Sequence, residues 1–279
     1  MLPGELPMGQ TPETEVAAGP TGPTICLFTC DRRPSVEYIN ESLKSLRDAC
    51  ENFPTEVHII IDGPEADFLD PCWSQLTNIH VIEKLDWEEI RRWNVHRRIA
   101  YSYHRAYTLG LKTNSDLLVC EDDIRFRSNF LAMLGEVVAE LETAGKKDGL
   151  LTLYSSQDLF NDRSLDRGRL FGWFPPRYFF GGQAVYFPRS ILEIADEFWM
   201  AAGWKAPETQ LRANDLLIGG LGEYLEQCIG DSSGLFRCYI DLVDHVGRES
   251  RTGLGQAFHS SSTFLMPWNG STASLPEIR

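Results

Sequence analysis

Apolar residues fall into short uninterrupted runs, and between the runs they recur every three or four positions. The runs at 24–29, 56–62 and 116–120 are typical of strands that are buried on both faces. Between the first two, a helix that opens at 31–35 places four apolar residues on one face: Val36, Ile39, Leu43 and Leu46. Strand, helix and strand in this order predict a right-handed crossover between parallel strands.

The same alternation continues towards residue 240. It predicts further strands at 79–82, 150–154, 183–187 and 235–240, and helices at 87–111, from 128, at 191–200 and at 211–227. We therefore expect one Rossmann-like α/β domain at 24–265, in which helices flank a mixed, mostly parallel sheet. Residues 1–23, rich in Pro, Gly and Thr, are predicted to be a flexible tail, and 266–279 a second tail.

Charge narrows the possible partners. The 279 residues include 26 Lys plus Arg and 40 Asp plus Glu, so the formal net charge is -14. An overall negative field disfavours general binding to nucleic acid or anionic membranes, although a local basic patch still suits one phosphate group. With 43% hydrophobic residues, the composition is that of a globular protein rather than a disordered one.

The cysteines and the hydropathy of the sequence indicate in which cellular compartment the protein is expected. The seven cysteines are scattered and contain no CxxC pair, which favours reduced core thiols over a disulfide framework or zinc site. No apolar run approaches the roughly 18–20 residues of a membrane-spanning helix, and the N-terminus lacks a signal-peptide pattern. These observations predict a cytoplasmic protein with no stable membrane insertion.

Three consecutive carboxylates, Glu121, Asp122 and Asp123, follow the apolar run at 116–120. Ligands of open α/β sheets bind at the carboxyl ends of the strands, where Thr29 and Asp62 are also expected. The mutual repulsion of the three acids indicates compensation by a cation, and their hard oxygens suit manganese or magnesium on a diphosphate. The alternative is a solvated acidic turn before the helix that begins near Ser128.

Positive charge is concentrated between residues 91 and 105, which contain five arginines and no acid. On one continuous helix, Arg91, Arg98 and Arg105 are seven residues apart and share a face, which predicts a stripe that contacts a diphosphate. The alternative for any single arginine is a solvated helix surface paired with Glu88 or Glu89.

Weaker signals lie further along the chain. Gly182, in the stretch 180–183, allows the close backbone approach that a sugar subsite needs, although paired glycines are more often a turn. Asp215, early in a predicted helix, is either a general base or a favourable charge at the helix N-terminus. His245 is either a metal or phosphate ligand or a structural histidine. The aromatic residues Trp173, Phe174, Tyr178 and Phe179 are either a platform for a sugar ring or core packing.

At Cys30-Asp31-Arg32 the sequence begins to resemble the GT-A fold nucleotide-sugar glycosyltransferases, most closely the inverting N-acetylglucosaminyltransferase I group. The likeness covers about 25–130. It extends through Asp62, through the helix motif of Ile99, Ala100, Tyr103 and Ala106, and through 119–123, and it returns at 255–258.

The resemblance implies that Arg32 contacts the nucleotide and that Asp62 hydrogen-bonds uracil. Glu121 and Asp122 would hold the ribose and the donor sugar, with Asp123 as the direct ligand of manganese. Asp215 would be the catalytic base, although Asn214 stands where the family has a first acid. In the wider GT-A set a C-terminal histidine often binds the metal, which makes His245 a candidate. Residues 247–258 would correspond to a loop that closes over the donor.

These observations predict a metal-dependent, inverting glycosyltransferase that uses a UDP-sugar, with N-acetylglucosamine or another hexose as the transferred group. Nucleotide-sugar contacts are assigned to Thr29, Arg32, Asp62, Arg98, Glu121, Asp122 and Gly182. The alternatives are a nucleotidyltransferase acting on sugar phosphates and a non-catalytic sugar-nucleotide binding module. The acceptor is left open between a glycan, a lipid-linked sugar, a protein and a small molecule, with a modified DNA base as a minor alternative.

Overall fold

The computed structural model describes residues 22–30, 38–50, 55–65, 67–69, 79–154, 169–179, 182–247 and 264, with side chains at 79–82 excepted. Its strands are β1 (Thr24–Thr29), β2 (Val57–Ile61), β3 (Ile79–Lys84), β4 (Leu117–Glu121), β5 (Ile124–Phe126), β6 (Asp148–Thr152), β7 (Phe171–Trp173), β8 (Ala184–Phe187), β9 (Ser233–Cys238) and β10 (Val243–His245). The α-helices are α1 (Tyr38–Cys50), α2 (Trp87–Ile90), α3 (Val95–Thr113), α4 (Phe130–Thr143), α5 (Leu192–Trp199) and α6 (Asn214–Ile229). Shorter turns of helix are η3 (Pro176–Tyr178), η4 (Arg189–Ile191), η5 (Met200–Trp204) and η6 (Glu208–Gln210).

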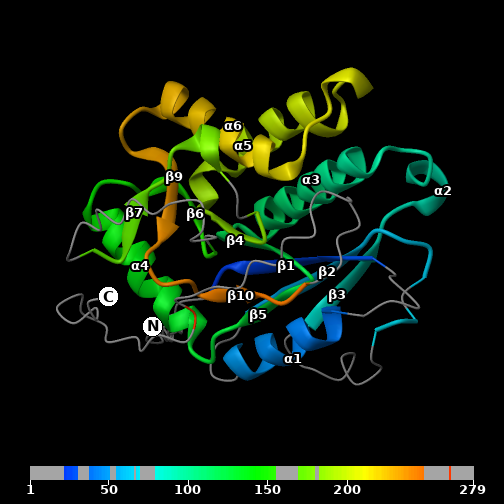
Figure 1. The fold of residues 1–279 in the computed structure, drawn as a ribbon, viewed down its shortest axis with the longest axis horizontal. Coiled ribbons are helices and arrows are strands. Elements are labelled where there is room, and N and C mark those ends of the chain that lie inside the picture. The colour runs from blue at the N-terminus through cyan, green and yellow to red at the C-terminus, as the bar shows by residue number, and fades with distance from the viewer. Residues whose placement is uncertain are drawn as a thin grey trace, which may run out of the picture.

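Within these residues, the main sheet has eight strands in the order β3-β2-β1-β4-β8-β6-β9-β7. β3, β2, β1 and β4 run parallel, as do β6 and β9, whereas β8 pairs antiparallel with both β4 and β6, and β7 pairs antiparallel with β9. A two-stranded antiparallel sheet of β5 and β10 lies beside it (Figure 1). The predicted α/β class, with a mixed and mostly parallel sheet flanked by helices, is confirmed.

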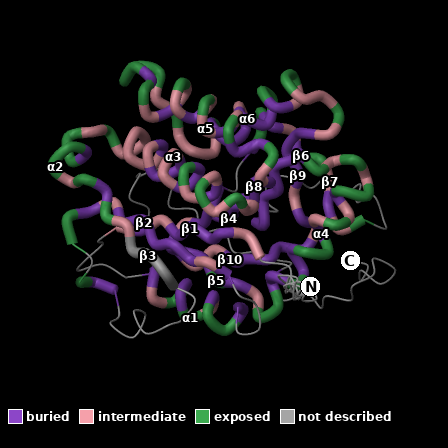
Figure 2. Tube along the Cα trace, turned by 180° about the vertical axis from the view of Figure 1, so that it is seen from behind, coloured by how far each residue is buried: buried purple, intermediate pink, exposed green. Residues whose placement is uncertain are grey.

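Helices cover both faces of the sheet, with α3, α5 and α6 on one face and α1 and α4 on the other (Figure 1). Each face has its own apolar core. Leu27 and Ile59 pack on the side of α1, and Tyr103, Trp199 and Leu221 pack on the side of α3, α5 and α6. Figure 2 shows the central strands buried between helices whose outer surfaces are exposed. Burial on both faces explains why these strands are uninterrupted apolar runs.

The predicted helix at 87–111 is wrong in one respect, because the segment forms two helices. α2 ends at Ile90, and after a turn the side chain of Asn94 accepts a hydrogen bond from the backbone N–H of His96 at 2.9 Å and starts α3. This is the N-cap arrangement that asparagine favours. α3 ends at Asn114, which adopts a left-handed conformation with φ 53°.

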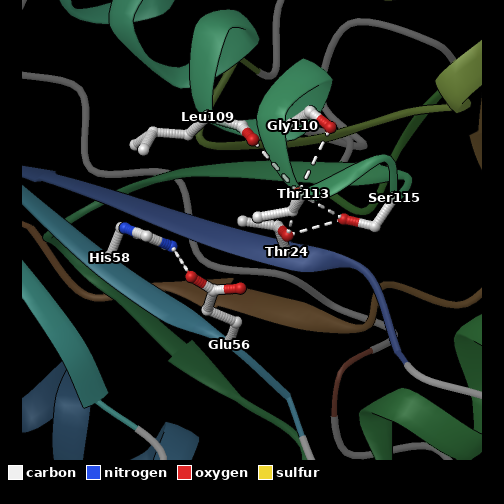
Figure 3. A network of polar contacts seen from close by, with 7 residues as sticks. All are labelled: Thr24, Glu56, His58, Leu109, Gly110, Thr113 and Ser115. Atoms are coloured by element: carbon white, nitrogen blue, oxygen red, sulfur yellow. Dashed lines mark hydrogen bonds and ion pairs between the residues drawn. The ribbon is translucent and has the colours of Figure 1, made fainter.

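Polar contacts fix the edge of the sheet opposite to the carboxyl ends of β1 and β4 (Figure 3). The Thr24 hydroxyl lies 2.9 Å from that of Thr113 and 2.6 Å from that of Ser115, which joins the start of β1 to the end of α3. In β2, Nε2 of the buried His58 lies 2.6 Å from Oε1 of Glu56. These contacts anchor the amino ends of the strands and leave the carboxyl ends to the polar side chains described next.

Three short strands were not expected. β5, β7 and β10 have three residues each, and β7 lies in the segment predicted to be loop. The predicted tails at 1–23 and 266–279 lie almost wholly outside the described residues, so the proposed domain limits stay predictions. Among the described residues, no helix is long and apolar enough to cross a membrane.

Candidate active site

The three carboxylates that follow β4 lie at the carboxyl edge of the sheet, because β4 pairs in parallel with β1. Asp122 is 2% exposed, and its Oδ2 accepts a hydrogen bond of 2.6 Å from the hydroxyl of Thr29, the last residue of β1. The structure therefore brings together two residues that the sequence assigned to one site, and it holds the Asp122 carboxylate in a fixed orientation.

The turn after β4 is held by Ser42, a residue that the sequence interpretation did not single out. Its hydroxyl lies 2.6 Å from the carbonyl oxygen of Asp122 and 2.5 Å from that of Ile124, and it accepts from the Ile124 N–H at 3.3 Å. Ser42 is fully buried in α1. The sequence does contain a signal for this role, because Ser42 lies on the apolar face of the helix, between Ile39 and Leu46, and a hydroxyl buried there needs a hydrogen-bond partner.

Asp123 lies opposite His245, which is 122 residues later in the chain. β10 pairs antiparallel with β5, His245 opposite Ile124, and this register sets Nε2 of His245 3.2 Å from Oδ2 of Asp123. The backbone N–H groups of Val246 and Gly247 donate to the Asp123 carbonyl oxygen at 2.8 and 3.3 Å. A Cβ atom at Gly247 would lie 2.3 Å from Asp123 Oδ2, so this close approach requires glycine.

The geometry around Asp123 fits a divalent cation that shares its ligands with a substrate. Asp123 Oδ1 is buried and has no hydrogen-bond partner among the described residues. The same residues contain no group of three His, Cys, Asp or Glu side chains able to hold a metal by themselves. Asp123 and His245 supply one carboxylate and one imidazole, so magnesium or manganese here would need further oxygen ligands, such as those of a diphosphate.

Glu121 lies at the centre of the negative charge. Burial raises the pKa of its carboxyl to about 8, and the charges of Asp123, Asp215 and Asp122 act in the same direction. A hydrogen bond of 2.9 Å from Asn214 Nδ2 to Glu121 Oε1 opposes this rise in pKa. Asn214, at the position where an acid was expected from the resemblance, is therefore a donor that offsets repulsion between carboxylates.

The start of α6 brings Asp215 to the same edge of the sheet. Asp215 Oδ1 accepts a hydrogen bond of 2.8 Å from the backbone N–H of Gly182, two residues before β8. A Cβ at Gly182 would lie 2.7 Å from this oxygen, so a larger residue would push the two segments apart. The buried hydroxyl of Tyr103 donates to the Gly182 carbonyl oxygen at 3.4 Å. Gly182 and Asp215, which are 33 residues apart, thus form one unit.

Asp62, at the end of β2, pairs with Arg98 of α3. Arg98 Nε donates to Asp62 Oδ2 at 3.0 Å, and the guanidinium lies over the Trp87 ring, 5.5 Å from its centroid. Both members of the pair are mostly buried, with side-chain exposures of 17% for Asp62 and 15% for Arg98. The carboxyl end of β2 therefore presents a fixed carboxylate and a fixed guanidinium beside the end of β1.

The predicted stripe of arginines is wrong. Arg91 lies in the turn after α2 and pairs with Glu88 at 3.1 Å, so it is not part of α3. Arg105 pairs with Glu83 of β3. Of Arg91, Arg98 and Arg105, only Arg98 contacts one of the predicted site residues, Asp62. The break between the helices separates Arg91 from the other two, and Arg105 is paired with Glu83, near the end of β3.

Some predicted site residues lie outside the described residues. These are Arg32, the glycine before Gly182, and the closing-loop segment beyond Gly247, including the stretch 255–258. The described members of the site lie at the ends of β1 and β4, directly after β2 and β4, in α3, α6 and β10, and two residues before β8. They form an edge that is rich in carboxylates and has a histidine at one side and an arginine at the other.

Comparison with known proteins gives a likeness in fold. No family model and no curated protein sequence matches the chain. Among solved structures, the chain resembles galactosyltransferase LgtC, in complex with donor and acceptor sugar analogues, at 14% identity over 76% of this chain and 72% of that one, with a TM-score of 0.43. It also resembles S. aureus TarS at 13% identity over 78% of this chain and 36% of that one, with a TM-score of 0.47. At this identity no residue role is carried over.

Proposed function

We propose that the protein transfers a sugar from a UDP-sugar to an acceptor hydroxyl with the aid of manganese or magnesium. The observation that carries the proposal is the contact between Asp123 and His245 at 3.2 Å, with the second Asp123 oxygen buried and without a partner among the described residues. Two further carboxylates, of Glu121 and Asp122, adjoin this contact. A diphosphate and a divalent cation together would complete the ligands and offset the charge.

The proposal assigns a role to each part of the edge. Asp123 and His245 hold the cation, which when bound neutralises the charge that develops on the departing diphosphate. Thr29 and Asp122 lie where the donor would pass, and Asp62 and Arg98 offer an acceptor and a donor to the uracil. Arg32 is assigned to the nucleotide by the sequence resemblance alone.

Asp215 is the proposed base that takes the proton of the acceptor hydroxyl. The Gly182 N–H holds one of its oxygens, at 2.8 Å, so the carboxylate is oriented before the acceptor arrives. With one base and no covalent intermediate, the acceptor oxygen attacks the anomeric carbon from the side opposite to the leaving diphosphate. The proposed reaction therefore inverts the anomeric configuration. Glu121 and Gly182 would contact the donor sugar between these groups.

The test is Asp123→Asn, measured by the melting temperature with UDP and manganese and by calorimetric titration. A ligand at about 100 times its dissociation constant stabilises by about 2.7 kcal/mol, which the wild type is expected to show and the variant to lose. The matched control is Asp196→Asn, because Asp196 of α5 also contacts a histidine, 2.5 Å from His104 Nδ1 of α3. Unchanged binding by Asp123→Asn would contradict the metal assignment.

Analysis of the products separates the proposal from its alternatives. A UDP-sugar and an acceptor should yield free UDP and a glycosylated product. Release of pyrophosphate from a sugar phosphate and UTP would instead identify a nucleotidyltransferase. Binding of UDP-sugar without hydrolysis or transfer across a broad set of acceptors would identify a binding module.

A further inference from the structure

Residues 173–179 and Gly182, here called the segment, lie along one stripe of α6 and follow it in the antiparallel direction. The stripe consists of Asp215, Gly219, Gly222 and Glu226, which lie at successive turns of the helix. Trp173 contacts Glu226, Pro176 lies against Gly222 and Gly219, Phe179 lies against Gly219, and Gly182 contacts Asp215. The segment therefore leads from β7 to the proposed base.

Glycines make the approach of this segment close. A Cβ atom at Gly219 would lie 2.3 Å from the Pro176 carbonyl oxygen, a distance that only glycine permits, whereas one at Gly222 would make an ordinary contact of 3.6 Å with Pro176 Cγ. The backbone of 176–179 is thus pressed against α6. Its side chains therefore lie either in the core or at the surface.

The aromatic residues of the segment divide between core and surface. Phe174 and Phe179 are buried, with exposures of 1% and 5%, and their rings meet edge to face at 5.4 Å. Trp173 and Tyr178 are 56% and 55% exposed, the two highest values among the aromatic residues that the structure describes as exposed large hydrophobics. Core packing, one of the two alternatives from the sequence, is therefore observed for the buried pair, which anchors the segment, whereas the exposed pair faces solvent.

The two exposed rings are held in place by polar neighbours. The Trp173 indole N–H donates to Glu226 Oε1 at 3.0 Å, and the Arg177 guanidinium lies 4.8 Å from the centroid of the Tyr178 ring. Exposed rings with fixed orientation are pre-organised for a flat apolar ligand surface, since little side-chain entropy is lost on binding. Fixed aromatic faces flanked by carboxylate and guanidinium groups suit a pyranose ring, which has apolar C–H faces and a rim of hydroxyls.

We infer that Tyr178 and Trp173 bind successive sugar rings of an oligosaccharide acceptor whose reacting hydroxyl lies at Asp215. At 1.5 Å of rise per residue, Gly219 is about 6 Å along the α6 axis from Asp215, and Glu226 is about 16 Å from it. Gly219 lies against Pro176 and Phe179, the segment that carries Tyr178, and Glu226 accepts the hydrogen bond of Trp173. These distances suit a chain of a few linked pyranoses. The inference rests on the proposed function, and it selects an oligosaccharide over a single sugar or a small metabolite as the acceptor.

The experiment measures saccharide binding directly, without a donor. The probe is an array of immobilised mono-, di-, tri- and tetrasaccharides of glucose, galactose, mannose and N-acetylglucosamine. The wild type is expected to retain at least one tri- or tetrasaccharide more strongly than the matching monosaccharide. Tyr178→Ala and Trp173→Ala should each weaken this binding about tenfold, the scale of one lost aromatic contact.

The matched control is Tyr224→Ala. Tyr224 is 41% exposed and also lies on α6, but its ring packs on Phe198 at 5.5 Å, away from the segment. Tyr224→Ala should bind the saccharides as strongly as the wild type does, and circular dichroism should show that all three variants are folded. The inference is overturned if the array retains no saccharide, if Tyr178→Ala or Trp173→Ala binds as the wild type does, or if Tyr224→Ala loses as much binding.

Titration with UDP and manganese keeps this result separate from the proposed function. Donor binding without any effect of Tyr178 and Trp173 on saccharides would leave the proposed function standing and remove the acceptor assignment. Saccharide binding that depends on both rings, without binding of UDP and manganese, would refute the proposed function and show instead a saccharide-binding surface.

Discussion

The replacement Ser42→Ala tests whether one buried hydroxyl supports the acidic turn. Ser42 is fully buried in α1, and its hydroxyl contacts three backbone groups of the turn, the carbonyl oxygens of Asp122 and Ile124 and the N–H of Ile124. Alanine removes the hydroxyl without adding volume. The direct effect is therefore confined to hydrogen bonds between α1 and the turn that carries Asp122 and Asp123.

The magnitude follows from the groups left behind. A typical hydrogen bond contributes a net of about 1 kcal/mol, and a buried backbone group left without a partner costs about 1–3 kcal/mol. Three groups share one hydroxyl, which donates only one proton, so we expect a loss of about 2 kcal/mol in the free energy of unfolding. For a chain of 279 residues, with an unfolding entropy of about 2.1 cal/mol/K per residue, that corresponds to a fall in melting temperature of about 3–4 °C.

Urea unfolding followed by circular dichroism measures the change in stability. The control is Thr108→Ala, because Thr108 is exposed on α3 and its hydroxyl only donates back to the His104 carbonyl oxygen at 2.9 Å. This control should change stability by less than about 0.5 kcal/mol. If Ser42→Ala changes the free energy of unfolding equally little, the turn is held by its own strand pairing and the reasoning about Ser42 is refuted. If the reasoning holds, the affinity for UDP and manganese should also fall in Ser42→Ala.

Three other outcomes are expected. Gly247→Ala should weaken binding of UDP and manganese by about tenfold or more, because its Cβ would displace the Asp123 carboxylate; unchanged binding in calorimetry would contradict this. Gly135→Ala, at an exposed site inside α4 with nothing within 4 Å of the new Cβ, should instead raise the free energy of unfolding by about 0.8–1 kcal/mol, and a lower melting temperature would count against it. Burial raises the pKa of the Cys50 thiol to about 12. At pH 8 a chromogenic disulfide reagent should therefore label the exposed Cys228 in the native protein and react with Cys50 only after unfolding. Equal labelling rates of the two cysteines in mass spectrometry would refute the burial of Cys50.

The part of the site on the parallel strands could be predicted from the sequence. Thr29, Asp62 and the acids after β4 each end an uninterrupted apolar run, and parallel strands place their carboxyl ends at one edge. The contact between Thr29 and Asp122 follows from this rule. Predicting these positions requires only the local apolar pattern and the parallel arrangement of the strands.

Positions that depend on distant or short contacts could not be predicted. The pattern at 87–111 is apolar at helical spacing on both sides of Asn94, so the helix break depends on one capping side chain that periodicity does not register. The lost arginine stripe follows from that break. β5, β7 and β10 are three residues long, too short for a period of two to be recognised, and each is stabilised by its partner strand.

His245 shows how such a short strand decides what the site can do. His245 and Asp123 are 122 residues apart, a spacing that carries no local signal of their contact. Pairing of β10 with β5, supported by Arg125 and Asp244 at 3.1 Å across the two strands, sets the histidine against the carboxylate. Burial, and after it the charges of Asp123, Asp215 and Asp122, raises the pKa of Glu121 to about 8, so the carboxylates of this edge repel one another. The pairing of β10 with β5 adds an imidazole beside Asp123, so that nitrogen and oxygen ligands for a divalent cation lie together without a further carboxylate.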